Sequence, residues 1–269
     1  MIFTKAFVPG ATVEEVLYNT DVYNGLYAYN YLGEHSYTVL DCIDTSMVYD
    51  ALSKRLRAYP QHHISIKMSQ LGFQTDLIQG ILVQALDAHL TVFFDMESSQ
   101  YTDIILNNSI ELFQKYGNVG ITLQSKLKRT RADMEKICEL NMPVRLCKGA
   151  YKERKEISYY GNDDIRKHFF DNIKFSLSNN KGLTAIATHD KSLIGSVCNF
   201  VNFRTNYFHY EFQMLYGIRP DIYKWLISEK KERVRLYTPF GDNVWPYFWR
   251  RIRENPKNLL LAARSMIGV

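Results

Sequence analysis

Short β-rich runs alternate with helical stretches along this 269-residue chain, and this alternation constrains its fold more than any other feature. Most of the runs are rich in Val, Ile, Phe or Tyr, which is typical of strands. Strands that alternate with helices favour a parallel sheet covered by those helices. The predicted strands are Leu26–Tyr31, His63–Met68, Leu90–Asp95, Val119–Gln124, Val144–Lys148, Leu183–Thr188, Tyr207–Glu211 and Val234–Thr238.

Two of the intervening segments predict amphipathic helices with recognisable starts. The segment 75–85 places its apolar residues at helical spacing, and Thr75 is the expected N-cap. The segment 130–140 opens Thr-Arg-Ala-Asp, so Thr130 and Asp133 predict a capping box with aspartate in place of glutamate. Eight such units within about 250 residues predict a single (β/α)₈ barrel. An open, doubly wound parallel sheet is the alternative.

Composition and charge exclude several classes of protein. A formal net charge of +5 is too small to indicate nucleic-acid binding, although it favours anionic ligands. None of the four cysteines forms a C-x-x-C pair, so we expect reduced thiols rather than a zinc or redox motif. No apolar run reaches the roughly 18 residues of a membrane span, and residues 1–5 lack a signal-peptide pattern. We therefore expect a soluble, cytoplasmic protein with one domain over residues 1–269.

Polar side chains gather at the ends of seven of the eight predicted strands, which is the most informative feature for function. Active sites of parallel barrels lie at the carboxyl ends of the strands. The charged residues of this set are Lys67, Asp95, Arg145 and Lys148. Three cations with one carboxylate would hold an anionic ligand while keeping the buried charge partly paired.

Other familiar sites are absent from the sequence. No G-x-G-x-x-G, P-loop or G-x-S-x-G pattern occurs, which argues against a Rossmann nucleotide site. His62 and His63 are adjacent on a strand and therefore point to opposite faces, so no metal site is expected there.

The segment Arg145–Tyr151 reads R-L-C-K-G-A-Y and resembles the R-L-V-K-G-A-Y signature of proline dehydrogenases. The resemblance runs in the family's order from about Phe7 to Gly268. Other segments similar to family motifs are Ile66–Gly72, Asp95–Glu97, Val119–Gln124 with Arg129–Thr130, Ala187–Asp190, Tyr210–Gly217, Tyr237–Gly241 and Trp245–Arg251.

Three features depart from the family pattern. The sequence shows no extra N-terminal helices of the kind that family members usually carry, so we expect a short or truncated version. Lys126 stands where an aromatic residue is common, and Asn30 stands where related sequences often have aspartate.

The resemblance implies a distorted (β/α)₈ barrel that holds FAD at the strand ends, with a C-terminal helix contributing to the active site. It also implies oxidation of L-proline to Δ1-pyrroline-5-carboxylate, with hydride passing from C5 to flavin N5, as the first step of proline degradation to glutamate. The family's electron acceptor is typically a membrane quinone. The apolar stretch 259–263 would permit peripheral membrane contact, and ordinary helix packing is its alternative.

Residue roles follow from the same resemblance. Lys67, Arg250 and Arg251 would bind the proline carboxylate. Arg145 would lie beside flavin N5, Asp95 would pair with Arg145 or Lys67, and Tyr237, expected to end its strand, would cover the C4 edge of proline. The residues that map to FAD contacts are Met96, Gln124, Lys148, Gly149, Ala150, Thr188 and His189.

Three other functions stay open from the sequence. Hydroxyproline oxidation would use the same scaffold. A non-catalytic barrel would bind flavin or proline as a sensor, although the complete set of charged residues speaks against it. A lysine Schiff-base aldolase on a similar barrel is the weakest of the three.

Overall fold

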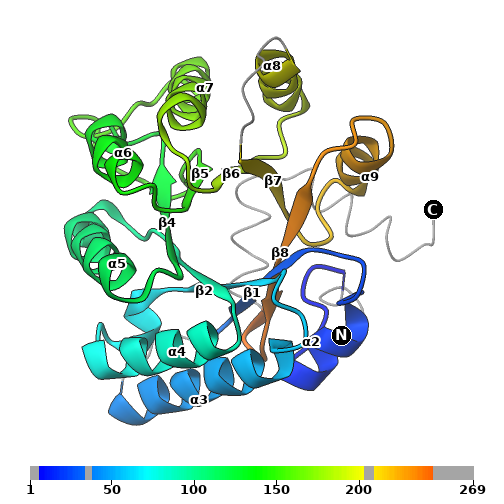
Figure 1. Ribbon diagram of the computed structural model, residues 1–269. Coiled ribbons are helices and arrows are strands. Elements are labelled where there is room, and N and C mark those ends of the chain that lie inside the picture. Colours follow the sequence, from blue (N-terminus) through cyan, green and yellow to red (C-terminus); the bar gives the residue numbers. More distant parts are fainter. Residues whose placement is uncertain (1–5, 34–37, 203–208, 245–269) are drawn as a thin grey trace. The chain divides into compact units, whose positions relative to one another are not determined.

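The computed structural model of the protein describes residues 6–33, 38–202 and 209–244. Eight strands in this part of the chain form a closed parallel barrel in chain order, from β1 to β8 (Figure 1). This confirms the predicted barrel and excludes the open sheet. The strands are β1 (Tyr27–Tyr31), β2 (His63–Ile66), β3 (Thr91–Phe94), β4 (Val119–Gln124), β5 (Val144–Cys147), β6 (Thr184–Ala187), β7 (Tyr210–Leu215) and β8 (Val234–Phe240).

Amphipathic helices connect the strands. In α4, Ile78, Ile81, Leu82 and Ala85 are buried, which is the helical spacing expected from the sequence. None of the described helices combines the length and the apolar character that crossing a bilayer requires. The helices are α2 (Val13–Asn19), α3 (Val39–Leu56), α4 (Thr75–Asp87), α5 (Thr102–Tyr116), α6 (Thr130–Glu139), α7 (Asn162–Asn179), α8 (Lys191–Asn202) and α9 (Pro220–Ser228), with the 3₁₀ turns η1 (Met68–Leu71) and η2 (Ser99–Tyr101).

The described residues divide into two compact units. The first unit comprises residues 6–92, 214–220 and 235–244, and the second comprises 93–213 and 221–234. In the first unit β1 pairs in parallel with both β2 and β8, and Tyr29 is aligned with Ile64 and with Thr238. Helices α3 and α4 pack side by side in this unit (Figure 1).

The second unit contains the run of neighbouring strands from β4 to β7. Their register aligns Thr122, Arg145, Ala185 and Glu211 across β4, β5, β6 and β7. All four residues are buried. Residues aligned in a parallel sheet point to the same face, so the register brings a buried arginine and a buried glutamate into one layer.

Both predicted helix caps are wrong. Helix α4 begins at Thr75 itself, and its N-cap Gln74 makes no side-chain cap. The N-cap of α6 is Arg129, again without a side-chain cap. The Thr130 hydroxyl instead donates to the Gln124 carbonyl, and Asp133 binds the Arg129 guanidinium. Both side chains therefore serve the connection from β4 to α6 rather than a capping box.

Several predicted strand ends are wrong: β2 ends at Ile66 rather than Met68, and two strands run further than predicted. Strand β7 was expected to end at Glu211 but continues to Leu215, and β8 was expected to end at Thr238 but continues to Phe240. Tyr237 therefore lies in the middle of β8 rather than at its end. The polar residues of β7 suggested a strand end, but in the structure they are paired in the interior, so the strand can continue.

The cysteines carry no disulfide. All four are free, as expected from their spacing. Burial raises the pKa of the Cys138 thiol to about 11 and that of Cys198 to about 12. Because the thiolate is the reactive form, these two buried thiols are unreactive at neutral pH.

Candidate functional site

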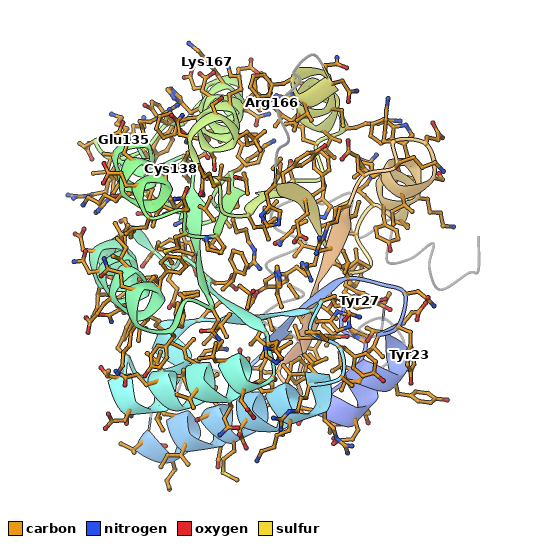
Figure 2. All side chains as sticks on the ribbon, in the orientation of Figure 1. Tyr23, Tyr27, Glu135, Cys138, Arg166 and Lys167 are labelled. Atoms are coloured by element: carbon orange, nitrogen blue, oxygen red, sulfur yellow. The ribbon has the colours of Figure 1, made fainter. Side chains whose placement is uncertain are left out.

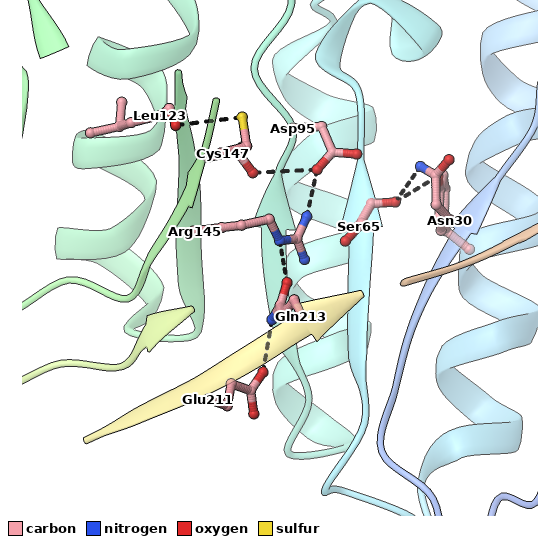
Figure 3. A network of polar contacts seen from close by, with 10 residues as sticks. Asn30, Ser65, Asp95, Leu123, Arg145, Cys147, Glu211 and Gln213 are labelled. Carbon is pink, nitrogen blue, oxygen red and sulfur yellow. Dashed lines mark hydrogen bonds and ion pairs between the residues drawn. The ribbon is translucent and has the colours of Figure 1, made fainter. Parts of the chain in front are cut away.

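A buried ion pair joins Arg145 on β5 to Asp95, the residue that follows β3. Arg145 Nη1 lies 2.6 Å from Asp95 Oδ1, and the two side chains are only 4% and 12% exposed (Figure 3). The Thr122 hydroxyl donates to the same carboxylate oxygen over 3.3 Å. The guanidinium carbon of Arg145 lies 4.7 Å from the centre of the Phe93 ring. Of the two partners expected for Asp95, Arg145 or Lys67, this ion pair shows Arg145.

A second contact holds the other side of the Arg145 guanidinium. Arg145 Nε donates to Gln213 Oε1 over 2.6 Å, and Gln213 Nε2 donates to Glu211 Oε1 over 2.7 Å (Figure 3). Glu211 Oε2 in turn lies 3.2 Å from Arg233 Nε. A buried charge is tolerated when it is paired and hydrogen-bonded. The two arginines and two carboxylates of this network balance in formal charge.

Lys148, directly after β5, belongs to a second polar cluster of the same unit. Its Nζ lies 2.9 Å from Asp190 Oδ2, and Arg166, which Figure 2 labels on α7, binds the same oxygen. Burial tends to raise the pKa of the Asp190 carboxyl, but the hydrogen bond and charge of Lys148 and the charge of Arg166 lower it below its ordinary value. Two cations on one carboxylate leave excess positive charge, which suits an anionic ligand.

Gly149 has a backbone conformation that side chains rarely adopt, with φ of +104°. A Cβ built there would lie 2.8 Å from Lys126 and 3.1 Å from Gln124 Oε1. Gln124 Nε2 donates to the Glu97 carbonyl, and Lys126 Nζ donates to the Tyr151 carbonyl over 2.7 Å. The backbone conformation and the contacts with Lys126 and Gln124 therefore favour glycine at position 149, whether or not a ligand lies close to it.

The other residues expected to contact a cofactor follow β3, β5 and β6 in the second unit. Met96 and Thr188 are buried, His189 is half-buried and Ala150 is exposed. The Thr188 hydroxyl accepts a hydrogen bond from the Asp190 backbone N–H over 3.2 Å. Thr188 is therefore tied to the Lys148 cluster.

The residues expected to bind substrate belong to the first unit or fall outside the described residues. Lys67 is half-buried directly after β2, and Tyr237 is half-buried within β8, both in the first unit. Arg250 and Arg251 fall outside the described residues. No group of three or more His, Cys, Asp or Glu side chains suited to a metal ion occurs within residues 6–33, 38–202 and 209–244.

Sequence reasoning assigned no role to Gln213, Glu211, Arg166 or Lys126. One local signal was present for the first two, because Glu211 and Gln213 are two residues apart and so lie on one face of a strand. No local signal marked Arg166, which lies on a helix among other charged residues.

The comparisons with known proteins agree with one another. The family model described as proline dehydrogenase matches residues 25–262. Proline dehydrogenase 1 of Bacillus subtilis strain 168 is 30% identical over 277 positions, covering 98% of this chain and 90% of that protein. Proline dehydrogenase 2 of the same strain is 33% identical over 211 positions, covering 76% of this chain and 69% of the relative.

Solved structures share the fold. Proline utilization A from Bdellovibrio bacteriovorus, inactivated by N-propargylglycine, superposes with a TM-score of 0.84 at 23% identity. That match covers 94% of this chain and 32% of the other, so the chain spans about a third of that protein. That likeness shows the shared fold, whereas the family match and the Bacillus relatives show that the chain belongs to the proline dehydrogenase family.

Proposed function

We propose that this protein oxidises L-proline to Δ1-pyrroline-5-carboxylate with FAD as its cofactor. The observation that carries the proposal is the 30% identity to a protein named proline dehydrogenase over 98% of this chain. In this reaction a hydride leaves C5 of proline, the nitrogen lone pair forms the C=N bond, and the nitrogen proton is then released. When bound, FAD supplies the two-electron acceptor for that hydride.

The donor set of the second unit fits a phosphate-bearing, electron-accepting cofactor. Lys148 and Arg166 share one carboxylate, so their cluster carries excess positive charge toward an anion. The missing Cβ of Gly149 makes room for the side chain of Lys126, so we propose that Gly149 contacts the cofactor through its backbone, which has a positive φ. We propose Met96, Gln124, Ala150, Thr188 and His189 as further FAD contacts.

Arg145 is the proposed electrostatic partner of the reacting ring. A fixed cation stabilises negative charge that develops during reduction, and it is most effective where water is excluded. Burial and the contacts to Asp95, Gln213 and Phe93 hold this guanidinium in place. Asp95 therefore acts as the orienting carboxylate of Arg145.

Proline itself offers a carboxylate and an apolar ring. We propose that Lys67, Arg250 and Arg251 bind the carboxylate, since arginine pairs both oxygens of such a group. Tyr237 would pack against C4 of the ring. We further propose a membrane quinone as the electron acceptor, with the protein acting in the cytoplasm as one domain and touching the membrane only peripherally.

Product analysis tests the proposal. The purified protein is incubated with FAD, L-proline and a soluble quinone, and the cyclic imine is trapped by condensation with o-aminobenzaldehyde. We expect the coloured adduct from L-proline and none from D-proline. Retained flavin without any imine product would favour a sensor, and product from trans-4-hydroxyproline alone would favour the hydroxyproline reaction.

A further inference from the structure

The amide of Gln213 connects the buried guanidinium of Arg145 to the buried carboxylate of Glu211. The two hydrogen bonds measure 2.6 Å and 2.7 Å, and the exposed fractions of Arg145, Gln213 and Glu211 are 3%, 2% and 0%. Both polar ends of this amide are therefore used inside the protein (Figure 3).

The two partners of Gln213 demand the same orientation of its amide. Arg145 Nε can only donate, so it requires the Gln213 oxygen. An ionised Glu211 can only accept, so it requires the Gln213 nitrogen. Were Glu211 replaced by a group that both donates and accepts, the amide could rotate and present its NH₂ group to the guanidinium.

Glu211 has a cationic partner on its other side. Arg233 Nε lies 3.2 Å from Glu211 Oε2, and the Arg233 side chain is 50% exposed. A row of alternating donors and acceptors thus runs from a solvent-exposed arginine to Arg145. Its order is Arg233, Glu211, Gln213 and Arg145, with Asp95 beyond.

We infer that Gln213 and Glu211 are positioning residues that together fix the orientation of the Arg145 guanidinium. Asp95 binds Nη1 and Gln213 binds Nε, so the plane of the guanidinium is fixed from two strands. The catalytic consequence rests on the proposed function, in which Arg145 faces the flavin. The orientation itself does not depend on that function.

A swap of the two side chains tests this inference. The single exchange Glu211→Gln removes the charge that orients the amide, and the single exchange Gln213→Glu sets two carboxylates against each other. The double exchange Glu211→Gln/Gln213→Glu restores a complete row, because the new carboxylate accepts from Arg145 and the new amide bridges it to Arg233. The matched control is Glu232→Gln, which alters a carboxylate that accepts from Tyr210 at the start of β7.

Hydrogen exchange of the Arg145 Nε–H, followed by NMR of ¹⁵N-labelled protein, is the first readout. The signal is assigned from its loss in Arg145→Lys. The backbone amide of Leu146, fully buried in β5, reports general opening. Relative to Leu146, we expect exchange about tenfold or more faster in Glu211→Gln, because the Gln213 amide can then turn its NH₂ group toward Arg145 Nε and the hydrogen bond to the guanidinium is lost. Gln213→Glu keeps a carboxylate acceptor for Nε and should therefore show a smaller change. The double exchange and Glu232→Gln should match the wild type. Equal protection in all variants, or a double exchange as fast as Glu211→Gln, would overturn the inference.

Steady-state kinetics with L-proline is the second readout. Glu211→Gln should lower kcat about tenfold with a much smaller change in KM, because Arg145 faces the flavin rather than the substrate. The double exchange should recover kcat. If kcat stays unchanged in Glu211→Gln while the Arg145 Nε–H exchanges faster, the orientation of Arg145 does not serve catalysis. This result would overturn the catalytic consequence of the inference. If the wild type does not oxidise proline, the proposed function fails, and the exchange data still decide the positioning.

Discussion

The side chain of Lys126 occupies the space next to Gly149 in which a Cβ would lie, with its Cγ and Cδ 2.8 Å from that point. Gly149→Ala should therefore suffer both a strained φ and a steric clash. Gly117 provides a matched comparison, because its φ of +77° is also positive but nothing lies within 4 Å of its added Cβ. We expect Gly149→Ala to cost about 1–3 kcal/mol more than Gly117→Ala in urea unfolding.

Removing the obstructing side chain provides the control. In Gly149→Ala/Lys126→Ala most of the additional loss should disappear, while the loss from the positive φ remains. Equal losses for the two glycine variants would show that Lys126 yields freely and that the contact has no effect on stability.

The buried ion pair of Asp95 and Arg145 predicts a graded effect on stability. Asp95→Ala leaves an uncompensated buried cation and should lower the free energy of unfolding by about 3–5 kcal/mol. Asp95→Asn keeps a hydrogen-bond acceptor for Arg145, so it should cost about 1.5–3 kcal/mol. Urea unfolding monitored by circular dichroism would measure both losses of stability.

An exposed ion pair is the control for that series. Arg57 and Asp87 lie 2.9 Å apart with side chains 64% and 61% exposed. Asp87→Asn should cost less than about 1 kcal/mol, because solvent screens such pairs. If Asp95→Ala were as mild as Asp87→Asn, the interior pair would contribute little to the fold.

Much of the fold could be predicted from the sequence, because strand composition and helical spacing are local properties. The same reasoning failed for β7. Whether Glu211 and Gln213 can lie inside a barrel depends on Arg145, 68 residues away from Gln213, and on Arg233 beyond α9. The Asp95–Arg145 pair was expected only as one of two pairings, Arg145 or Lys67, because Arg145 stands at the start of its strand whereas Asp95 follows the end of another. The contact between Arg166 and Asp190 could not be anticipated, because the local sequence does not show which face of α7 meets the strand ends.

His62 predicts a dependence of stability on pH. Its Nδ1 accepts the Tyr27 backbone N–H, so its Nε2–H donates to the Val22 carbonyl. Burial, aided by the charge of Arg235, lowers the pKa of His62 to about 4 from 6.5, although the bond to Val22 acts in the opposite direction. The unfolded chain therefore binds the proton first as pH falls. Stability from this group is complete above pH 6.5 and is lost between about pH 6.5 and pH 4, by about 3 kcal/mol.

Unfolding curves across this pH range check the effect. His62→Gln should be less stable than the wild type at pH 7, and the difference should shrink toward pH 4. The exposed His209 is the control, and His209→Gln should follow the wild-type curve. A constant difference between His62→Gln and the wild type from pH 7 to pH 4 would contradict the buried neutral state of His62.

Tyr237 predicts substrate choice. In the proposed site the phenol ring of Tyr237 packs against C4 of proline and leaves no room for a hydroxyl group, so the wild type should strongly prefer L-proline over trans-4-hydroxyproline. Tyr237→Ser should lose activity on proline because packing and alignment are lost, and it should keep or gain relative activity on hydroxyproline. The measure is the ratio of the two kcat/KM values. A ratio unchanged by the substitution would remove Tyr237 from the substrate site.

The central claim, proline oxidation by bound FAD, is tested most directly by one anaerobic absorbance spectrum. The purified protein, reconstituted with FAD and freed of excess cofactor, is mixed with L-proline in the absence of any electron acceptor. Oxidised flavin absorbs at about 450 nm, and this band is lost when the flavin is reduced. We expect the band to bleach with L-proline and to stay unchanged with D-proline. A protein that retains FAD but keeps its full absorbance with L-proline, or that never retains FAD, would contradict the claim.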